Sequence, residues 1–120
     1  MNQRDETREF EPKFGPDGLL TAIVVEADSN TVLMVAHMND LALKKTQETG
    51  FAHFHSRSRN RLWMKGESSG NTLRVTDILV DCDQDALLVR ARPDGPACHT
   101  GRHSCFYRRL EGQALRYVRD

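Results

Sequence analysis

The sequence has no hydrophobic run of the roughly 18 residues that a membrane-spanning helix needs, so we expect no membrane partner. Its first ten residues, MNQRDETREF, are charged and lack the apolar centre of a secretory signal, which favours a cytoplasmic location. An excess charge of one sign is also missing, because 17 Lys and Arg balance 17 Asp and Glu. A net charge of zero argues against a nucleic-acid partner, since such proteins normally carry a basic face.

Cysteine is scarce as well. The chain has three, Cys82, Cys98 and Cys105. An odd number without a secretory context argues against a disulfide framework and indicates reduced thiols, which can bind metal. Internal repeats, low-complexity segments and linkers are absent too, and 120 residues suit one domain.

Most of the chain carries β-strand signals. Residues 18–26 and 31–38 are rich in β-branched and apolar side chains and flank a polar turn, which predicts a β-hairpin. Asn39 as N-cap and Gly50 as C-terminal stop predict one short helix between them. Further strands are predicted at 51–55, 61–64, 72–80, 86–90, 104–109 and 115–118.

These elements define the predicted fold class, which is mainly β and borders on α+β. The strands are expected to pair mostly antiparallel, with the helix packed against them. Residues 14–120 form the predicted single domain, and the charged residues 1–13 are predicted to be a flexible tail. The core of so short a chain is thin, so association with a second copy would help to stabilise it.

The densest candidate site is Asp81, Asp83 and Asp85. In an extended segment the three carboxylates would lie on one face, with Cys82 on the other. They repel one another unless a divalent cation or basic groups lie among them. The alternative is an exposed acidic loop without a ligand. An EF-hand is excluded, because Ala86 stands where that loop needs glycine.

A second candidate site is the segment CHTGRHSC, which contains Cys98, His99 and Cys105. Thiolates and imidazoles are the ligands that zinc prefers, but the two cysteines are farther apart than in a zinc finger. Cys82 could be a third ligand if the fold, or a second subunit, brings it near. Three protein ligands and a water would form a catalytic zinc site, in which His99 could accept a proton from the water or bind the metal itself. The alternative is that the cysteines are small buried apolar residues.

A third candidate site is basic. Arg57, Arg59 and Arg61 would share one face of an extended segment, and guanidinium groups in a row suit phosphate oxygens. The small residues of the following loop, 66–70, would let backbone amides approach an anion. The alternative is a solvated basic strand edge. Trp63 by itself fits a core or interface position better than a base-stacking one.

Three motifs together resemble phosphoribosyl-AMP cyclohydrolase, an enzyme family of histidine biosynthesis. They are SRSRNRLWMKGESSG at 56–70, DCDQD at 81–85 and GPACHTGRHSCFYRR at 95–109. Their order and separation also match, and the similarity covers roughly residues 14–110. The resemblance implies a small nucleotide substrate, phosphoribosyl-AMP, and hydrolytic opening of its adenine ring at the N1–C6 bond by a zinc-activated water.

The resemblance also implies Zn²⁺ and Mg²⁺ as cofactors, and a homodimer whose zinc sites are shared across the interface. The implied zinc ligands are Cys82, Cys98 and Cys105. The implied magnesium ligands are Asp81, Asp83 and Asp85. The implied catalytic residue is His99. The implied substrate-binding residues are Arg57, Arg59, Trp63, Lys65, Glu67 and Ser69.

The fold that the resemblance implies is an antiparallel β pseudo-barrel capped by one helix. The sequence departs from the family pattern at His37, His55 and His103, where two aromatic residues and an arginine are usual, and none of the three is an implied metal ligand. Two other functions stay open. One is a non-catalytic phosphate- or nucleotide-binding module with a structural zinc, and the other is a diverged paralogue with altered metal use. A zinc deaminase is excluded, because its H-x-E and P-C-x-x-C pattern is absent.

Overall fold

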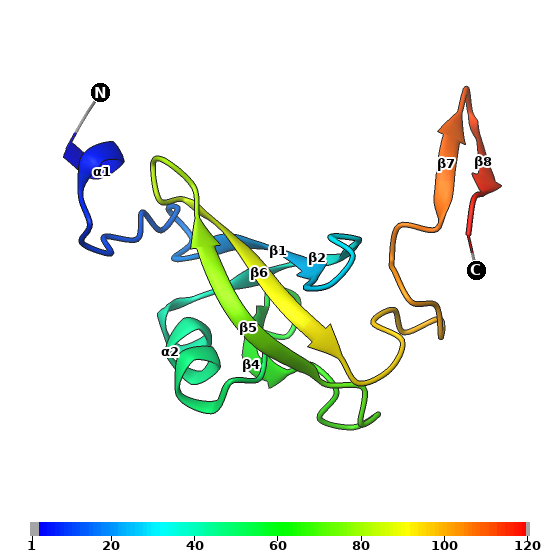
Figure 1. Cartoon of the computed structure of the whole chain (residues 1–120), viewed down its shortest axis with the longest axis horizontal. Coiled ribbons are helices and arrows are strands. Elements are labelled where there is room, and N and C mark those ends of the chain that lie inside the picture. Colours follow the sequence, from blue (N-terminus) through cyan, green and yellow to red (C-terminus); the bar gives the residue numbers. More distant parts are fainter. Residues whose placement is uncertain (1–2, 120) are drawn as a thin grey trace.

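A four-stranded sheet is the central element of the computed structural model, which describes residues 3–119 (Figure 1). Its strands are β1 (Leu20–Glu26), β2 (Val32–Met38), β5 (Leu73–Val80) and β6 (Ala86–Pro93). They lie in the order β2-β1-β6-β5. The pairs β1–β2 and β5–β6 are antiparallel, whereas β1 and β6 are parallel. The sheet therefore consists of two hairpins joined along one parallel seam, and the predicted first hairpin is confirmed.

The core forms on the inner face of this sheet. Alternate residues of the central strands point inward, as the two-residue period of a strand requires, and Val24 and Val89 are fully buried there. Helix α2 (Asp40–Thr49) adds the buried side chains Ala42 and Leu43 to the same apolar cluster. Burial of this cluster gives the short chain its main stabilising contribution.

Helix α2 begins and ends where the sequence predicts. The side chain of Asn39 accepts a hydrogen bond from the backbone N–H of Ala42 at 2.9 Å. Gly50 adopts a left-handed conformation, with φ 80°, and its N–H donates to the carbonyl of Thr46. The buried hydroxyl of Thr46 in turn accepts from the backbone N–H of His53 at 2.9 Å, which ties the helix to the next strand.

A second, two-stranded sheet lies with α2 on one side of the central sheet (Figure 1). It consists of β3 (His53–Ser56) and β4 (Arg61–Met64), which pair antiparallel. The ring of Phe54 is fully buried, and the half-buried ring of Trp63 packs on it with 5.2 Å between centroids. This contact fixes the β3–β4 hairpin against the core.

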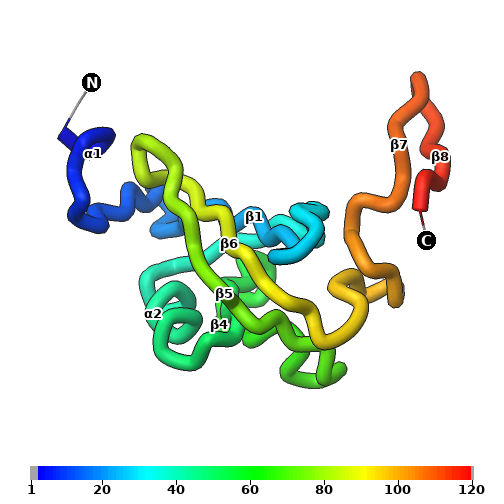
Figure 2. The backbone as a smooth tube through the Cα atoms, in the orientation of Figure 1, coloured from blue at the N-terminus to red at the C-terminus, as the bar shows by residue number. Residues whose placement is uncertain are grey.

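A third, two-stranded sheet stands away from the body of the molecule (Figure 2). It pairs β7 (Arg108–Glu111) with β8 (Ala114–Tyr117), and all eight residues are exposed. The rings of Tyr107 and Tyr117 stack at its base with 6.0 Å between centroids. The guanidinium of Arg102 lies 4.1 Å from the centroid of the Tyr107 ring, which links the hairpin to the cysteine-containing loop.

The segment before β1 is hydrogen-bonded to the turn between β5 and β6. It contains a one-turn helix, α1 (Gln3–Glu6), that the sequence did not indicate. The backbone N–H of Lys13 donates to the carbonyl of Gln84 at 2.7 Å.

Across residues 3–119, the helices are too short or too polar to cross a membrane.

Three features of the predicted fold need correction. The described chain has two helices instead of one, because α1 precedes the domain. The strand pairing is mostly antiparallel, as expected, but β1 and β6 run in the same direction, which departs from the antiparallel barrel that the resemblance implies. The expected pseudo-barrel is not closed within residues 3–119, where the strands form three separate sheets. Strand patterns indicate which segments are extended, but the pairing of distant strands depends on packing across the whole chain.

Candidate functional site

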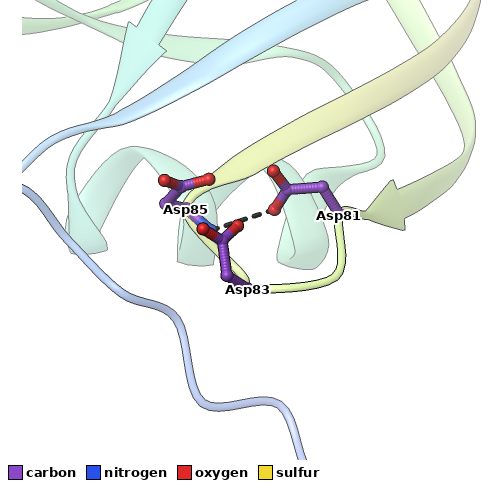
Figure 3. A group of neighbouring side chains, drawn as sticks. All are labelled: Asp81, Asp83 and Asp85. Atoms are coloured by element: carbon purple, nitrogen blue, oxygen red, sulfur yellow. Dashed lines mark hydrogen bonds between the residues drawn. The ribbon is translucent and has the colours of Figure 1, made fainter. Parts of the chain in front are cut away.

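The three aspartates of the DCDQD motif converge in the turn between β5 and β6 (Figure 3). One carboxylate oxygen from each of Asp81, Asp83 and Asp85 lies within 4.8 Å of the others. The segment is a turn and not the extended strand that the sequence analysis assumed. An Asp81 oxygen accepts hydrogen bonds from the N–H groups of Asp85 at 3.0 Å and Ala86 at 3.1 Å, which hold the turn closed. Closely spaced carboxylates are ligands that a hard divalent cation prefers.

The crowding of these carboxylates separates their pKa values. Desolvation opposes the ionisation of Asp81, but the hydrogen bonds from the backbone of Ala86 and from Asp85 outweigh it, so its pKa lies below the ordinary value. The carboxylates of Asp81 and Asp83 raise the pKa of Asp85 to about 6, because a protonated Asp85 can donate to them. In the absence of a cation, ionising Asp85 as the third carboxylate of the turn is therefore less favourable than ionising the other two.

We expect the carboxyl of Asp85 to titrate near pH 6 in the metal-free protein, against an ordinary value of 3.8. It is protonated below this pH and becomes the third charge of the turn above it. Asp83→Asn removes one neighbouring charge and should shift the midpoint downward, whereas Asp28→Asn, in a different turn, should leave it unchanged. Carboxyl ¹³C NMR measures the titration. A wild-type midpoint near 4 would contradict this account.

Two of the three predicted zinc ligands, Cys98 and Cys105, lie together. Their thiols lie close enough to shift each other's pKa, and the hydroxyl of Thr100 donates to the Cys98 sulfur at 3.1 Å. The backbone N–H of Cys98 donates to the carbonyl of Arg102, which closes the loop between the cysteines. The N–H of Cys105 donates to the carbonyl of Leu33, which anchors the loop on β2. The fold thus places the sulfur atoms of Cys98 and Cys105 side by side, where both could bind one metal ion.

The two thiols differ in acidity. Burial opposes the ionisation of Cys98, but hydrogen bonds from Thr100 and Cys105 outweigh it and lower the pKa of this thiol. Desolvation and the neighbouring Cys98 raise the pKa of Cys105 to about 11. The positive charge of the Lys65 ammonium lowers the pKa of both thiols. This predicted substrate-binding residue therefore lies near Cys98 and Cys105.

The third predicted zinc ligand, Cys82, precedes strand β6, whereas Cys98 follows it, so the two lie at opposite ends of that strand. Eight residues of extended strand span roughly 26 Å, so the three thiols do not meet within one chain. Among residues 3–119, the triad of aspartates is the one group of three or more potential ligands that gathers in space. A complete three-thiol site therefore needs a second copy of the chain.

The predicted arginines line a cavity of about 310 Å³ between the end of β2 and the β3–β4 hairpin. Its lining residues are Ala36, His37, His55, Ser56, Arg57, Arg59, Arg61, Trp63 and Glu67. Arg57 and Arg59 lie in the turn between the strands and not in the extended segment that the sequence analysis assumed. The guanidinium of Arg61 pairs with the carboxylate of Glu67 at 3.0 Å, which leaves the other two as the candidate anion contacts.

Four of the six predicted substrate-binding residues line this cavity, and two do not. Arg57, Arg59, Trp63 and Glu67 are in its wall. Lys65 is near the thiols instead, and Ser69 lies in the following loop, where its hydroxyl accepts from the N–H of Asn71 at 3.2 Å. His99 directly follows Cys98 and is exposed to solvent.

The sequence alone did not indicate that two histidines line this cavity. His37 and His55 line it, and both were visible only as departures from the family pattern. Desolvation, followed by the positive charge of Arg57, lowers the pKa of His37, so its imidazole is neutral at pH 7. The ring of His55 lies within 3.3 Å of the side-chain amide nitrogen of Asn39.

Guanidinium groups around a cavity, together with carboxylates that could hold a divalent cation, are the combination that enzymes acting on phosphorylated substrates use. The family model for phosphoribosyl-AMP cyclohydrolase matches residues 34–107. This range includes the arginines, the aspartates and all three cysteines.

Curated relatives extend the match to almost the whole chain. The phosphoribosyl-AMP cyclohydrolase of Sphingopyxis alaskensis is 63% identical over 119 residues, which cover 98% of this chain and 94% of the relative. That of Erythrobacter litoralis is 57% identical over 117 residues, with the same coverage of both chains. That of Bradyrhizobium sp. strain ORS 278 is 61% identical over 102 residues, or 85% of this chain and 78% of the relative. The chain belongs to the phosphoribosyl-AMP cyclohydrolase family, a family of hydrolases, and the prediction of an enzyme is confirmed.

Proposed function

We propose that this chain hydrolyses phosphoribosyl-AMP and opens its adenine ring at the bond between N1 and C6, as a step of histidine biosynthesis in the cytoplasm. The observation that carries the proposal is the 63% identity, over 98% of the chain, to a relative of that name. The geometry supports it, because the arginine-lined cavity, the carboxylate triad and the thiol pair all come from the matched residues.

The triad of Asp81, Asp83 and Asp85 fits a magnesium ion. Its oxygens lie close enough for one cation to contact all three, and the raised pKa of Asp85 is consistent with a turn whose third negative charge a cation would stabilise. A bound magnesium supplies positive charge for phosphate oxygens. The role of the three side chains is to place that charge at the end of the β5–β6 hairpin.

The thiols of Cys98 and Cys105 fit two positions of a zinc site. Thiolates are preferred zinc ligands, and the lowered pKa of Cys98 favours the form that binds metal. A zinc ion with three protein ligands supplies a Lewis acid that lowers the pKa of bound water to about 7. We assign the third ligand to Cys82 of the partner subunit, because Cys82 of the same chain lies at the far end of β6.

An apolar row on the outer face of the central sheet supports the homodimer. Val35, Ile23, Leu88 and Leu79 are register partners across all four strands. Val35 is 45% exposed and Leu79 is 48% exposed. A contiguous apolar surface of this kind is typical of a protein interface, and a second copy would cover it.

His99 and the arginine-lined cavity complete the proposed roles. Arg57 and Arg59 would bind a substrate phosphate, while the half-buried ring of Trp63 would limit the position of the sugar or base. His99, next to Cys98 and open to solvent, would move a proton between the attacking water and the departing ring nitrogen. Holding the purine between these groups would bring C6 to the nucleophile.

One assay tests this function directly. Purified protein is incubated with phosphoribosyl-AMP, and ring opening is followed by its ultraviolet absorbance change. We expect turnover that a chelator abolishes and that zinc with magnesium restores. A zinc- and magnesium-loaded protein without turnover would contradict the proposal and favour the nucleotide-binding module instead.

A further inference from the structure

The segment before β1 is held on the metal-binding turn by one buried side chain, Gln84. Its side-chain oxygen accepts from the backbone N–H of Glu11 at 2.7 Å, and its side-chain nitrogen donates to the carbonyls of Arg4 at 3.2 Å and Glu9 at 3.3 Å. Its own carbonyl accepts from the N–H of Lys13. Gln84 is 6% exposed, and its neighbours in the turn are Asp83 and Asp85. Four hydrogen bonds thus fix residues 4–13 beside the triad, and Figure 3 shows the segment passing it.

A cavity of about 290 Å³ lies between this segment and the turn. Asp81 and Cys82 form part of its wall, and Arg4 and Arg8 form part of the opposite wall. The Nε of Arg4 donates to the carbonyl of Glu11 at 2.9 Å, which fixes the direction of this guanidinium. The acidic residues Asp5 and Glu9 also contribute to the wall. A divalent cation on the triad would offset two of the negative charges around this cavity, so the guanidinium groups of Arg4 and Arg8 would then face a much less acidic wall.

This second cavity lies at the same end of the sheet as the arginine-lined one. Thr21 of β1 pairs with His37 on one side and with Ala86 on the other. Because neighbouring strands are about 4.8 Å apart, His37 and Ala86 are separated by roughly 10 Å. His37 lines the first cavity, and Ala86 directly follows the triad. One small molecule could reach both.

We propose that residues 4–13 form a wall of the active site, and that Arg4 and Arg8 bind the second phosphate of the substrate. The inference rests on the proposed function. Phosphoribosyl-AMP carries two phosphate groups, one on each ribose, and the chain offers two separate guanidinium-lined cavities. Arg57 and Arg59 serve one phosphate, and Arg4 and Arg8, next to the cation on the triad, serve the other. Gln84 is the positioning residue that holds this wall.

Arginine variants test the binding role. A charge-assisted hydrogen bond to a phosphate contributes substantially to the free energy of substrate binding. Arg4→Ala and Arg8→Ala should therefore each raise KM for phosphoribosyl-AMP about tenfold, while kcat stays within about twofold of the wild-type value. In a Cys98→Ser background, which prevents turnover, the same changes should weaken equilibrium binding of phosphoribosyl-AMP about tenfold in the presence of magnesium. The matched control is Arg92→Ala, because Arg92 pairs with Asp28 at the other end of β6.

The outcomes separate this inference from the proposed function. KM and Kd within about twofold of the parent proteins for both variants would overturn the binding role, while wild-type turnover would still stand. If the wild type showed no turnover but Arg4→Ala and Arg8→Ala still weakened the binding of phosphoribosyl-AMP, the binding role of residues 4–13 would be supported. The proposed hydrolase activity would then be contradicted. No binding of phosphoribosyl-AMP to the magnesium-loaded parent would overturn both.

Gln84→Gly tests the positioning role. Gln84 has φ 60°, a left-handed conformation that glycine adopts freely, so this change removes the side-chain hydrogen bonds without straining the turn. Amide exchange at Glu11 should become at least about tenfold faster, and KM should rise as in the arginine variants. Gln84→Glu keeps the side-chain acceptor for the N–H of Glu11 but loses the donor. Its exchange rate at Glu11 and its KM should therefore lie between those of the wild type and Gln84→Gly. Unchanged exchange at Glu11 and unchanged KM in Gln84→Gly would contradict the role of Gln84.

Discussion

Replacing Cys98 with serine is expected to lower kcat/KM for phosphoribosyl-AMP at least about a thousandfold and to remove bound zinc. The thiol is buried, contacts Cys105, and has a lowered pKa, so it is the sulfur best prepared to bind metal as a thiolate. A serine hydroxyl is nearly the same size but does not ionise near neutral pH, and it is a poor zinc ligand. Initial rates, together with zinc content per subunit after dialysis, measure both effects.

Thr100→Val provides the control for Cys98→Ser. It removes the hydroxyl that donates to the Cys98 sulfur but keeps all three thiols. We therefore expect zinc to stay bound, with a higher pKa for Cys98 and a modest loss of rate. Thermal unfolding of Thr100→Val should resemble that of the wild type, because the change lies in a loop and the zinc stays bound. Full turnover by zinc-free Cys98→Ser protein would exclude the zinc mechanism.

Mixing two inactive variants is expected to restore activity. Cys82→Ser and Cys98→Ser homodimers would each lack one ligand in both sites. In a heterodimer, the site built from Cys82 of the second variant and Cys98 of the first is intact, while the other site lacks both ligands. Random assortment makes half of the dimers mixed, so co-refolded protein should recover about a quarter of wild-type activity per subunit.

A same-chain zinc site gives the opposite result. If Cys82 and Cys98 of one chain bound the same ion, no combination of the two variants would contain an intact site, and the mixture would stay inactive. Mixing Cys98→Ser with Cys105→Ser is the matched control. These thiols lie together in one chain, so their heterodimers should also stay inactive.

Local features of the fold were predictable from the sequence, and distant pairings were not. Asn39 and Gly50 marked the ends of α2 because capping depends on a few neighbouring residues. The β1–β2 hairpin followed in the same way from two apolar segments around a polar turn. The parallel pairing of β1 with β6 joins residues more than sixty positions apart, and no local pattern specifies it.

The site shows the same division. The residue types of DCDQD indicated a cation site, and the structure brings the three carboxylates together, although by a turn and not along a strand. Gln84 gave no signal, because its function depends on backbone groups of residues 4–11 that are distant in sequence. The position of Lys65 near the thiols likewise arises only when the loop from Cys98 to Cys105 returns to β2.

The parallel seam between β1 and β6 has a consequence for the growing chain on the ribosome. β1 can pair with β2 as soon as residue 38 has emerged, but its other edge has no partner until residues 86–93 are made. At about 5–20 residues per second, that edge is exposed for several seconds of synthesis. An unpaired strand edge invites intermolecular pairing, so this interval is when the nascent protein is most exposed to aggregation and to capture by chaperones.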